Sequence, residues 1–191
     1  MNSEECILYL HKPDKKEIAF FVISGFFLSV PMTIFFETTA SGYLPNFLSI
    51  DLSRIIFTII AAPLIEEFAK IFPIFYRHGE TEKSLIILGF SLGLGFGISE
   101  FVEYVFFFGA PFYLRLPIIF FLASTTSIIA YGIALGQTYR YYAVSVILHF
   151  FVNSLAVIKP YPVVAFIVIL GVSFALFSRL YLSSSDKFNV K

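Results

Sequence analysis

The sequence predicts an all-α membrane protein, a polytopic bundle of about six transmembrane helices in the cell membrane. Of its 191 residues, 58% are hydrophobic and only 14% are charged, whereas a soluble domain is about half apolar and about a quarter charged. Apolar stretches of about 20 residues, the length that crosses the hydrocarbon core, recur along the chain. Because backbone polar groups in lipid must bond within their own segment, these stretches are expected to be helices.

Six windows of the chain meet this length and polarity test. In order they are about Ile18–Phe36, Leu52–Tyr76, Ser84–Phe108, Leu116–Gln137, Tyr141–Ile158 and Tyr161–Tyr181. The first is expected to end at Glu37 and the polar residues after it. Since no linker is long enough to separate two domains, residues 1–191 are predicted to form a single membrane domain.

The distribution of basic residues predicts that both termini are cytoplasmic. Of the 13 Lys and Arg residues, nine fall on the side of the N-terminus, three fall on the opposite side, and Lys70 lies inside a span. Short cytoplasmic loops carry such an excess. The net charge is zero and no basic run exists, so nucleic acid is not expected as a partner. The single Cys6 excludes an internal disulfide framework and a cysteine-based zinc site.

The second window carries charges that are costly in lipid. Glu66, Glu67 and Lys70 come after Pro63 within it, and a charge at the bilayer centre costs roughly 2.5–3.5 kcal/mol on insertion scales. Glu66 and Lys70 are four residues apart, so they are expected to pair on one helix face. Glu67 is about 100° further round and is expected to face elsewhere.

The third window combines a glycine strip with further acids. Gly89, Gly93 and Gly97 recur at every fourth residue, a spacing that allows another helix to approach closely. Glu100 comes just beyond the strip, and Glu103 comes one turn later on nearly the same face. Glu103 is interpreted either as part of the acidic set or as an interfacial charge.

The fifth window places His149 and Asn153 four residues apart on one face. Three interpretations of the whole polar set are open: a polar zipper, an ion or proton pathway, and a catalytic site. Interhelical polar contacts contribute only about 0.6 kcal/mol on average, too little to offset several buried carboxylates. The acids form a compact group instead of a ladder along a pore, so the catalytic interpretation is favoured over transport.

Glutamate and histidine are ligands of zinc and similar divalent ions, and a catalytic zinc uses three protein ligands plus water. A carboxylate outside the coordination shell can then take a proton from that water. On this hypothesis Glu66 or Glu67 is the base, and Glu67, Glu100 and His149 are the candidate metal ligands. Asn153 is the candidate donor to a developing oxyanion. The reaction implied is hydrolysis of a peptide bond within or near the membrane.

These residues resemble the motifs of the PrsW family of intramembrane metalloproteases. Its Glu-Glu-x-x-Lys motif is similar to Glu66–Lys70, its Phe-x-x-x-Glu-Asn-x-x-Tyr motif to Phe96–Tyr104, and its His-x-x-x-Asn motif to His149–Asn153. Phe101 stands where Asn is usual. The resemblance covers about residues 60–155, and the family it indicates is related to the CAAX prenyl endopeptidases and bacteriocin-processing proteins. It implies zinc or another divalent metal, and a substrate that is a membrane protein or a lipid-anchored peptide.

The chain departs from the family pattern at one position. The family has a histidine eight residues before a Gly-x-x-x-Gly, and here Ser124 precedes Gly132–Gly136 at that distance. The other histidines, His11 and His78, lie outside the predicted spans. Two hypotheses arise from the resemblance, an active protease and a catalytically inactive relative that acts as a membrane scaffold or binder. A proton- or ion-coupled transporter is the third.

Overall fold

The computed structural model describes residues 12–76, 81–157 and 162–186, and these ranges are helical with short connections. His11 and His78 lie outside the described residues. The chain begins with α1 (Lys15–Ser24), continues through η1 (Gly25–Ser29) into α2 (Val30–Tyr43), and reverses after η2 (Leu44–Asn46). The remaining elements are α3 (Ile50–Ile56), η3 (Phe57–Ala61), α4 (Ala62–Ile71), η4 (Phe72–Tyr76), α5 (Glu82–Val102), η5 (Glu103–Phe107), α6 (Phe112–Ala134), α7 (Thr138–Val157) and α8 (Val163–Ser183).

The described helices agree with the prediction of about six spans. Five of them are long and apolar enough to cross a membrane: Lys15–Asn46, Glu82–Phe107, Phe112–Ala134, Thr138–Val157 and Val163–Ser183. A sixth continuous helical stretch, Ile50–Tyr76, carries Glu66, Glu67 and Lys70 and is not among these five. The segment that departs from a plain membrane span is thus the one with the most internal charge.

The first span is longer than the sequence predicts. Glu37 is expected to end the helix near Phe36, but α2 continues to Tyr43 with Glu37 in its interior. Hydroxyl groups beyond Glu37 bond back to their own helix: Thr39 Oγ1 donates to the Phe35 carbonyl at 2.8 Å, and Ser41 Oγ donates to the Thr38 carbonyl at 3.1 Å. Because these polar side chains are satisfied locally, they do not break the helix.

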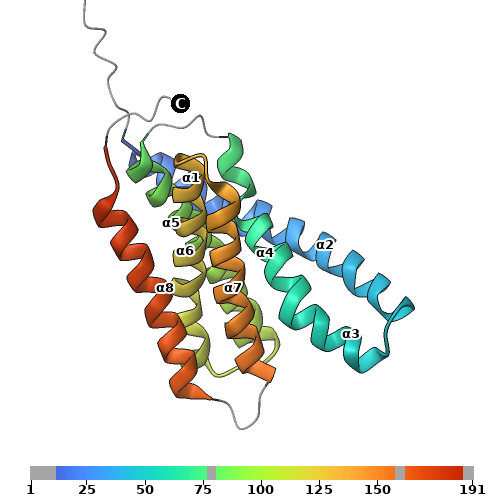
Figure 1. Cartoon of the computed structure of the whole chain (residues 1–191). Helices are drawn as coiled ribbons and strands as arrows, with labels where there is room; N and C mark the ends of the chain where they lie inside the picture. The colour runs from blue at the N-terminus through green and yellow to red at the C-terminus, as the bar shows by residue number, and fades with distance from the viewer. Residues whose placement is uncertain (1–11, 77–80, 158–161, 187–191) are drawn as a thin grey trace, which may run out of the picture.

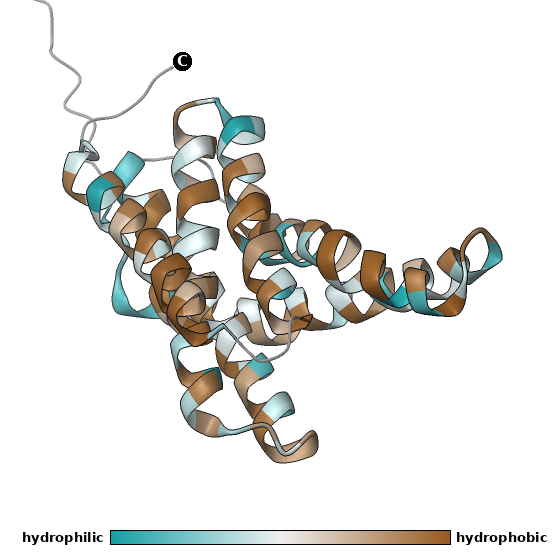
Figure 2. Ribbon diagram, turned by 60° about the horizontal axis from the view of Figure 1, so that its bottom comes forward, coloured by the Kyte–Doolittle hydropathy of each residue, from teal (hydrophilic) through white to brown (hydrophobic). Residues whose placement is uncertain are grey.

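The helices form a bundle with a projecting arm (Figure 1). In that view α5, α6, α7 and α8 run side by side, and α1 crosses one end of the group. The hairpin made by α2 and α3 extends away from it, and α4 leads back to the bundle. Figure 2 shows hydrophobic residues along much of the helical ribbon and hydrophilic residues at several helix ends and connections, and many large hydrophobic side chains are exposed on the helices. This distribution is typical of a protein whose solvent is lipid.

The glycine strip of α5 packs against α6, as the sequence predicts. A Cβ on Gly89 would lie 2.5 Å from the Ala130 Cβ, and one on Gly93 would lie 2.5 Å from the Leu122 carbonyl oxygen. A Cβ on Gly97 would lie 2.9 Å from the Ile119 Cα. No side chain fits at these three places, so the two backbones come close together there.

Gly93→Ala tests this close packing. The added methyl group has no room against α6, so we expect the free energy of unfolding to fall by about 1–3 kcal/mol, the cost of overpacking a core. Reversible unfolding in mixed detergent micelles measures the change. Gly171→Ala on α8 is the matched control, because nothing lies within 4 Å of a Cβ built there. A Gly93→Ala protein as stable as the control would contradict the predicted packing.

Candidate active site

The candidate site is organised around Glu67, a carboxylate with no exposed surface. Its Oε1 atom lies 2.6 Å from the Lys70 Nζ and 2.8 Å from the His149 Nδ1. The Thr125 hydroxyl donates to the same oxygen at 3.1 Å. Three helices, α4, α6 and α7, therefore meet at one carboxylate oxygen. A buried charge is tolerated when it is paired and hydrogen-bonded in this way.

The structure corrects the expected partner of Lys70. Sequence spacing favours a pair between Glu66 and Lys70, but the Lys70 ammonium bonds Glu67, three residues away. Residues three and four apart are both neighbours on a helix, so spacing alone does not choose between them. Lys70 is fully buried and also lies 5.5 Å from the centre of the Phe96 ring. Glu67 shares this interior, because both side chains point into the bundle.

Glu67 also decides which nitrogen of His149 carries a proton. An ionised carboxylate only accepts hydrogen bonds, so His149 donates to it from Nδ1. In a neutral imidazole the other nitrogen, Nε2, then presents a lone pair, and this atom lies 3.6 Å from the Glu66 Oε2. That Glu66 oxygen is buried and has no hydrogen-bond partner among the described residues. The Phe121 ring meets the imidazole edge-on at 5.5 Å and restricts its orientation.

Glu100 reaches the same region from α5. It is paired with Arg115, a residue for which the sequence pattern indicates no role in the site. Arg115 of α6 donates from Nη2 to the Glu100 Oε1 at 2.8 Å. The Arg115 guanidinium also lies over the Tyr104 ring, 3.6 Å from its centre. From the sequence, Arg115 is only a basic residue near the outer end of a span. The structure places it in the first turn of α6, whereas the predicted span begins only at Leu116.

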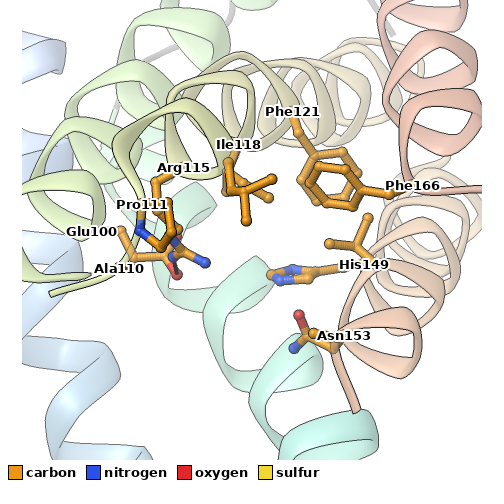
Figure 3. A pocket seen from close by; sticks show the side chains of 12 residues that line it. Glu100, Ala110, Pro111, Arg115, Ile118, Phe121, His149, Asn153 and Phe166 are labelled. Carbon is orange, nitrogen blue, oxygen red and sulfur yellow. Dashed lines mark hydrogen bonds and ion pairs between the residues drawn. The ribbon is translucent and has the colours of Figure 1, made fainter. Parts of the chain in front are cut away.

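Two cavities flank Glu66 and His149. The first, about 170 Å³, is lined by Glu100, Arg115, His149, Asn153 and mostly apolar side chains, which include Phe121 and Phe166. Figure 3 shows Arg115 and Glu100 on one side of it and His149 above Asn153 on the other. The Asn153 Nδ2 donates to the Thr58 carbonyl at 2.9 Å. An amide nitrogen has two N–H groups, so one is left for another acceptor.

The second cavity, about 110 Å³, is lined by four glutamates: Glu37, Glu66, Glu100 and Glu103. Glu103 is an exposed residue in η5 and belongs to this cavity wall. The sequence pattern does not indicate a site role for Glu37, because this residue falls at the predicted end of the first span. The sequence does hold one indication of a role for Glu37: it is an acid in a stretch that can continue as a helix, as α2 does.

Each helix that carries one of these acids has a π-helical turn close by. The turns are η1 before α2, η3 before α4 and η5 directly after α5. A π-helical turn adds a residue to the helix and rotates the residues beyond it, and such turns occur often at functional sites. Here η1 and η3 set the rotation of Glu37 and Glu66 about their helix axes, and Glu103 is the first residue of η5.

Ser124 does not reach this group of side chains through its hydroxyl, which donates to the Phe120 carbonyl of its own helix at 2.7 Å. The neighbouring Thr125 makes the contact with Glu67 instead. Within the described ranges, no group of three or more His, Cys, Asp or Glu side chains is arranged to hold one metal ion. Glu67 and Glu100 each have Oε1 engaged by Lys70 or Arg115, and the buried Oε2 of each has no partner among the described residues. Because a cation is already paired with each of these two carboxylates, they do not fit a divalent ion in this arrangement. The predicted ligand set of Glu67, Glu100 and His149 stays a prediction.

Comparison with known proteins identifies one family. The family model described as PrsW family intramembrane metalloprotease matches residues 14–178. This is wider than residues 60–155, on which the motif resemblance depends, and it includes α1, α2 and most of α8. No curated protein and no solved structure matches the chain.

Lys70→Met tests the central ion pair. It leaves the Glu67 charge buried without its cation, and we expect the free energy of unfolding to fall by about 3–5 kcal/mol. Adding Glu67→Leu in the same chain should recover much of that loss, because the unpaired charge is then gone. Unfolding in detergent measures all three proteins.

Lys83→Met is the control for that experiment. Lys83 pairs with Asp186 at 3.7 Å on the surface, where an ion pair contributes about 0–1 kcal/mol. Equal losses in Lys70→Met and Lys83→Met would contradict the central role of the buried pair.

Proposed function

The chain belongs to the PrsW family of intramembrane metalloproteases, and from that premise we propose that it hydrolyses peptide bonds of membrane-associated proteins with Glu66 as the general base. One observation carries the proposal. The Glu66 Oε2 is buried, has no hydrogen-bond partner among the described residues, and lies 3.6 Å from the His149 Nε2. Both atoms accept hydrogen bonds, so they are suited to hold the two hydrogens of one water molecule.

A water held in this way has its oxygen lone pairs free to attack a carbonyl carbon. Glu66 takes one proton of the water as the C–O bond forms, and the peptide carbonyl becomes a tetrahedral oxyanion. Glu66 then gives the proton to the amide nitrogen as the C–N bond breaks, which yields an amine and a carboxylic acid. A positioned base of this kind contributes typically 10²–10⁴-fold to a rate. The free N–H of Asn153 is the proposed donor to the oxyanion.

Glu67 is proposed as a positioning residue. Its pairing with Lys70 fixes the carboxylate, and the carboxylate fixes the His149 tautomer that leaves Nε2 as an acceptor. In many enzymes a carboxylate accepts a hydrogen bond from the histidine nitrogen that faces away from the reaction, and this bond orients the imidazole. Glu66 is free for proton transfer because Glu67 takes the structural contacts.

A divalent ion is implied by the family. His149 Nε2 and Glu66 Oε2 are the two donors that face each other, one fewer than the three of a catalytic zinc. Ser124 stands where the family pattern has a further histidine. The proposed steps therefore use only water and the side chains of this chain.

An inactive relative that binds a transmembrane segment is the second candidate. The Ser124 replacement favours it, because a family ligand has been lost and the Ser124 hydroxyl bonds its own helix. The two candidates differ in one measurement: the protease cleaves a transmembrane peptide in detergent, and the binder holds the peptide uncut. A coupled transporter would instead require an ion gradient, which detergent micelles do not provide.

Glu66→Gln is the direct test of the base. We expect kcat for cleavage of a transmembrane peptide to fall roughly 10²–10⁴-fold, with the Tm close to that of the wild type because Glu66 is not the partner of Lys70. Asp51→Asn, an exposed acid on α3, is the control and should cleave like the wild type. Normal cleavage by Glu66→Gln would refute this assignment.

Metal content is measured on the same preparations. With only two facing donors, we expect less than one zinc per chain after dialysis, determined by elemental mass spectrometry. Zinc at one equivalent that is lost in both Glu66→Gln and His149→Ala would contradict this expectation and assign the two residues as ligands.

A further inference from the structure

We propose that the acidic cavity beside Glu66 is a subsite for a cationic side chain, lysine or arginine, of the peptide substrate. The proposal rests on the protease function above, since it assigns the residue that flanks the cleaved bond. The acidic cavity is the 110 Å³ space lined by Glu37, Glu66, Glu100 and Glu103.

The charges around the acidic cavity are not balanced by the protein. Within the described residues, only one of its four glutamates pairs with a Lys or Arg, namely Glu100 with Arg115. Glu37 and Glu103 form no such ion pair in the same ranges, and Lys70 is bonded to Glu67. Carboxylates from α2, α4, α5 and η5 therefore converge with a single cation. Carboxylates gathered in a partly buried space either take up protons or attract an opposite charge.

A second and independent observation points to a ligand in the same place. Thr33 of α2 also lines the acidic cavity, is only 6% exposed, and has a hydroxyl with no hydrogen-bond partner among the described residues. Buried hydroxyls are nearly always hydrogen-bonded in proteins. A hydroxyl without a partner can donate to a carboxylate and still accept a hydrogen bond from an N–H donor such as an ammonium or guanidinium group.

The other walls suit the rest of such a side chain. Val30, Ile34 and Phe96 contribute apolar surface to the acidic cavity, against which the methylene stem of lysine or arginine packs while its charged end reaches the carboxylates. A cavity volume of about 110 Å³ exceeds the roughly 10–15 Å³ that a cavity needs to hold one water. The space is therefore larger than a single trapped water requires.

The position of the acidic cavity sets its role. Glu66 lines it, and the same carboxylate faces His149, which lines the other, largely apolar cavity. A peptide bond at Glu66 and His149 would thus have the acidic cavity on one side and the apolar cavity on the other. The geometry points to cleavage between a cationic residue and an apolar residue.

Paired peptides test this specificity. Four transmembrane peptides in detergent differ at one central position, which carries lysine, arginine, norleucine or glutamate. Mass spectrometry locates the bond that is cleaved in each. Norleucine matches the lysine stem without its charge. We expect kcat/KM for the lysine peptide to exceed that for the norleucine peptide about tenfold or more, because hydrogen bonds to charged groups are the stronger class. The glutamate peptide is expected to be the slowest.

Variants of the acidic cavity connect the preference to these residues. Glu37→Gln with Glu103→Gln should move the lysine-to-norleucine ratio of kcat/KM toward one, and Thr33→Val should lower it less. Asp51→Asn, an acid outside the acidic cavity, should keep the wild-type ratio. Size-exclusion chromatography and Tm in detergent establish that each variant is folded.

Binding of the same peptides, measured by fluorescence anisotropy, separates the two proposals. A protein that cuts no peptide but binds lysine peptides more tightly than norleucine peptides would refute the protease function and support the cationic site. Cleavage with equal kcat/KM for lysine and norleucine would refute the cationic site alone. A lysine preference that survives in the doubly substituted protein would also refute it.

Discussion

The ion pair between Glu67 and Lys70 is the interaction on which the arrangement of the site depends. Both side chains are fully buried and 2.6 Å apart, and a buried charge without a partner would cost several kcal/mol. The same Glu67 oxygen also bonds His149 and Thr125. One neutralised carboxylate thus ties α4 to α6 and α7, and it determines the tautomer and orientation of the imidazole.

The helix packing supplies the framework for that interaction. The glycine strip of α5 lets α6 approach its backbone, which places Thr125 and Arg115 of α6 next to the acids of α4 and α5. π-helical turns adjoin α2, α4 and α5, and each turn changes which side chains face inward. The site is built by local changes of helix rotation and by the close approach of helices that small residues allow in membrane bundles.

The two adjacent glutamates have different environments, which supports the different roles proposed for them. The Glu67 Oε1 receives the Lys70 ammonium, the His149 ring and the Thr125 hydroxyl, so a positioning role is proposed for this residue. Glu66 has a buried oxygen without a partner among the described residues, faces His149, and lines the acidic cavity. Division of labour between neighbouring carboxylates is a recurring feature of hydrolytic sites. In this chain it connects the proposed chemistry to the proposed recognition of a cationic residue.

The sequence by itself determined the membrane class, about six helical spans, the glycine face of α5 and the family. Each of these follows from local spacing or short motifs, since a helix repeats every 3.6 residues and a bilayer requires about 20. It also selected Glu66, Glu67, Glu100 and His149, because charged or ionisable groups stand out in apolar segments.

Only the tertiary structure decided how these groups pair. Residues at i+3 and i+4 are equivalent neighbours by spacing, and the inward rotation of α4 assigned Lys70 to Glu67. The contributions of Glu37 and Arg115 depend on the crossing of helices far apart in the chain, because residue spacing within one helix carries no information on the side chains across the interface.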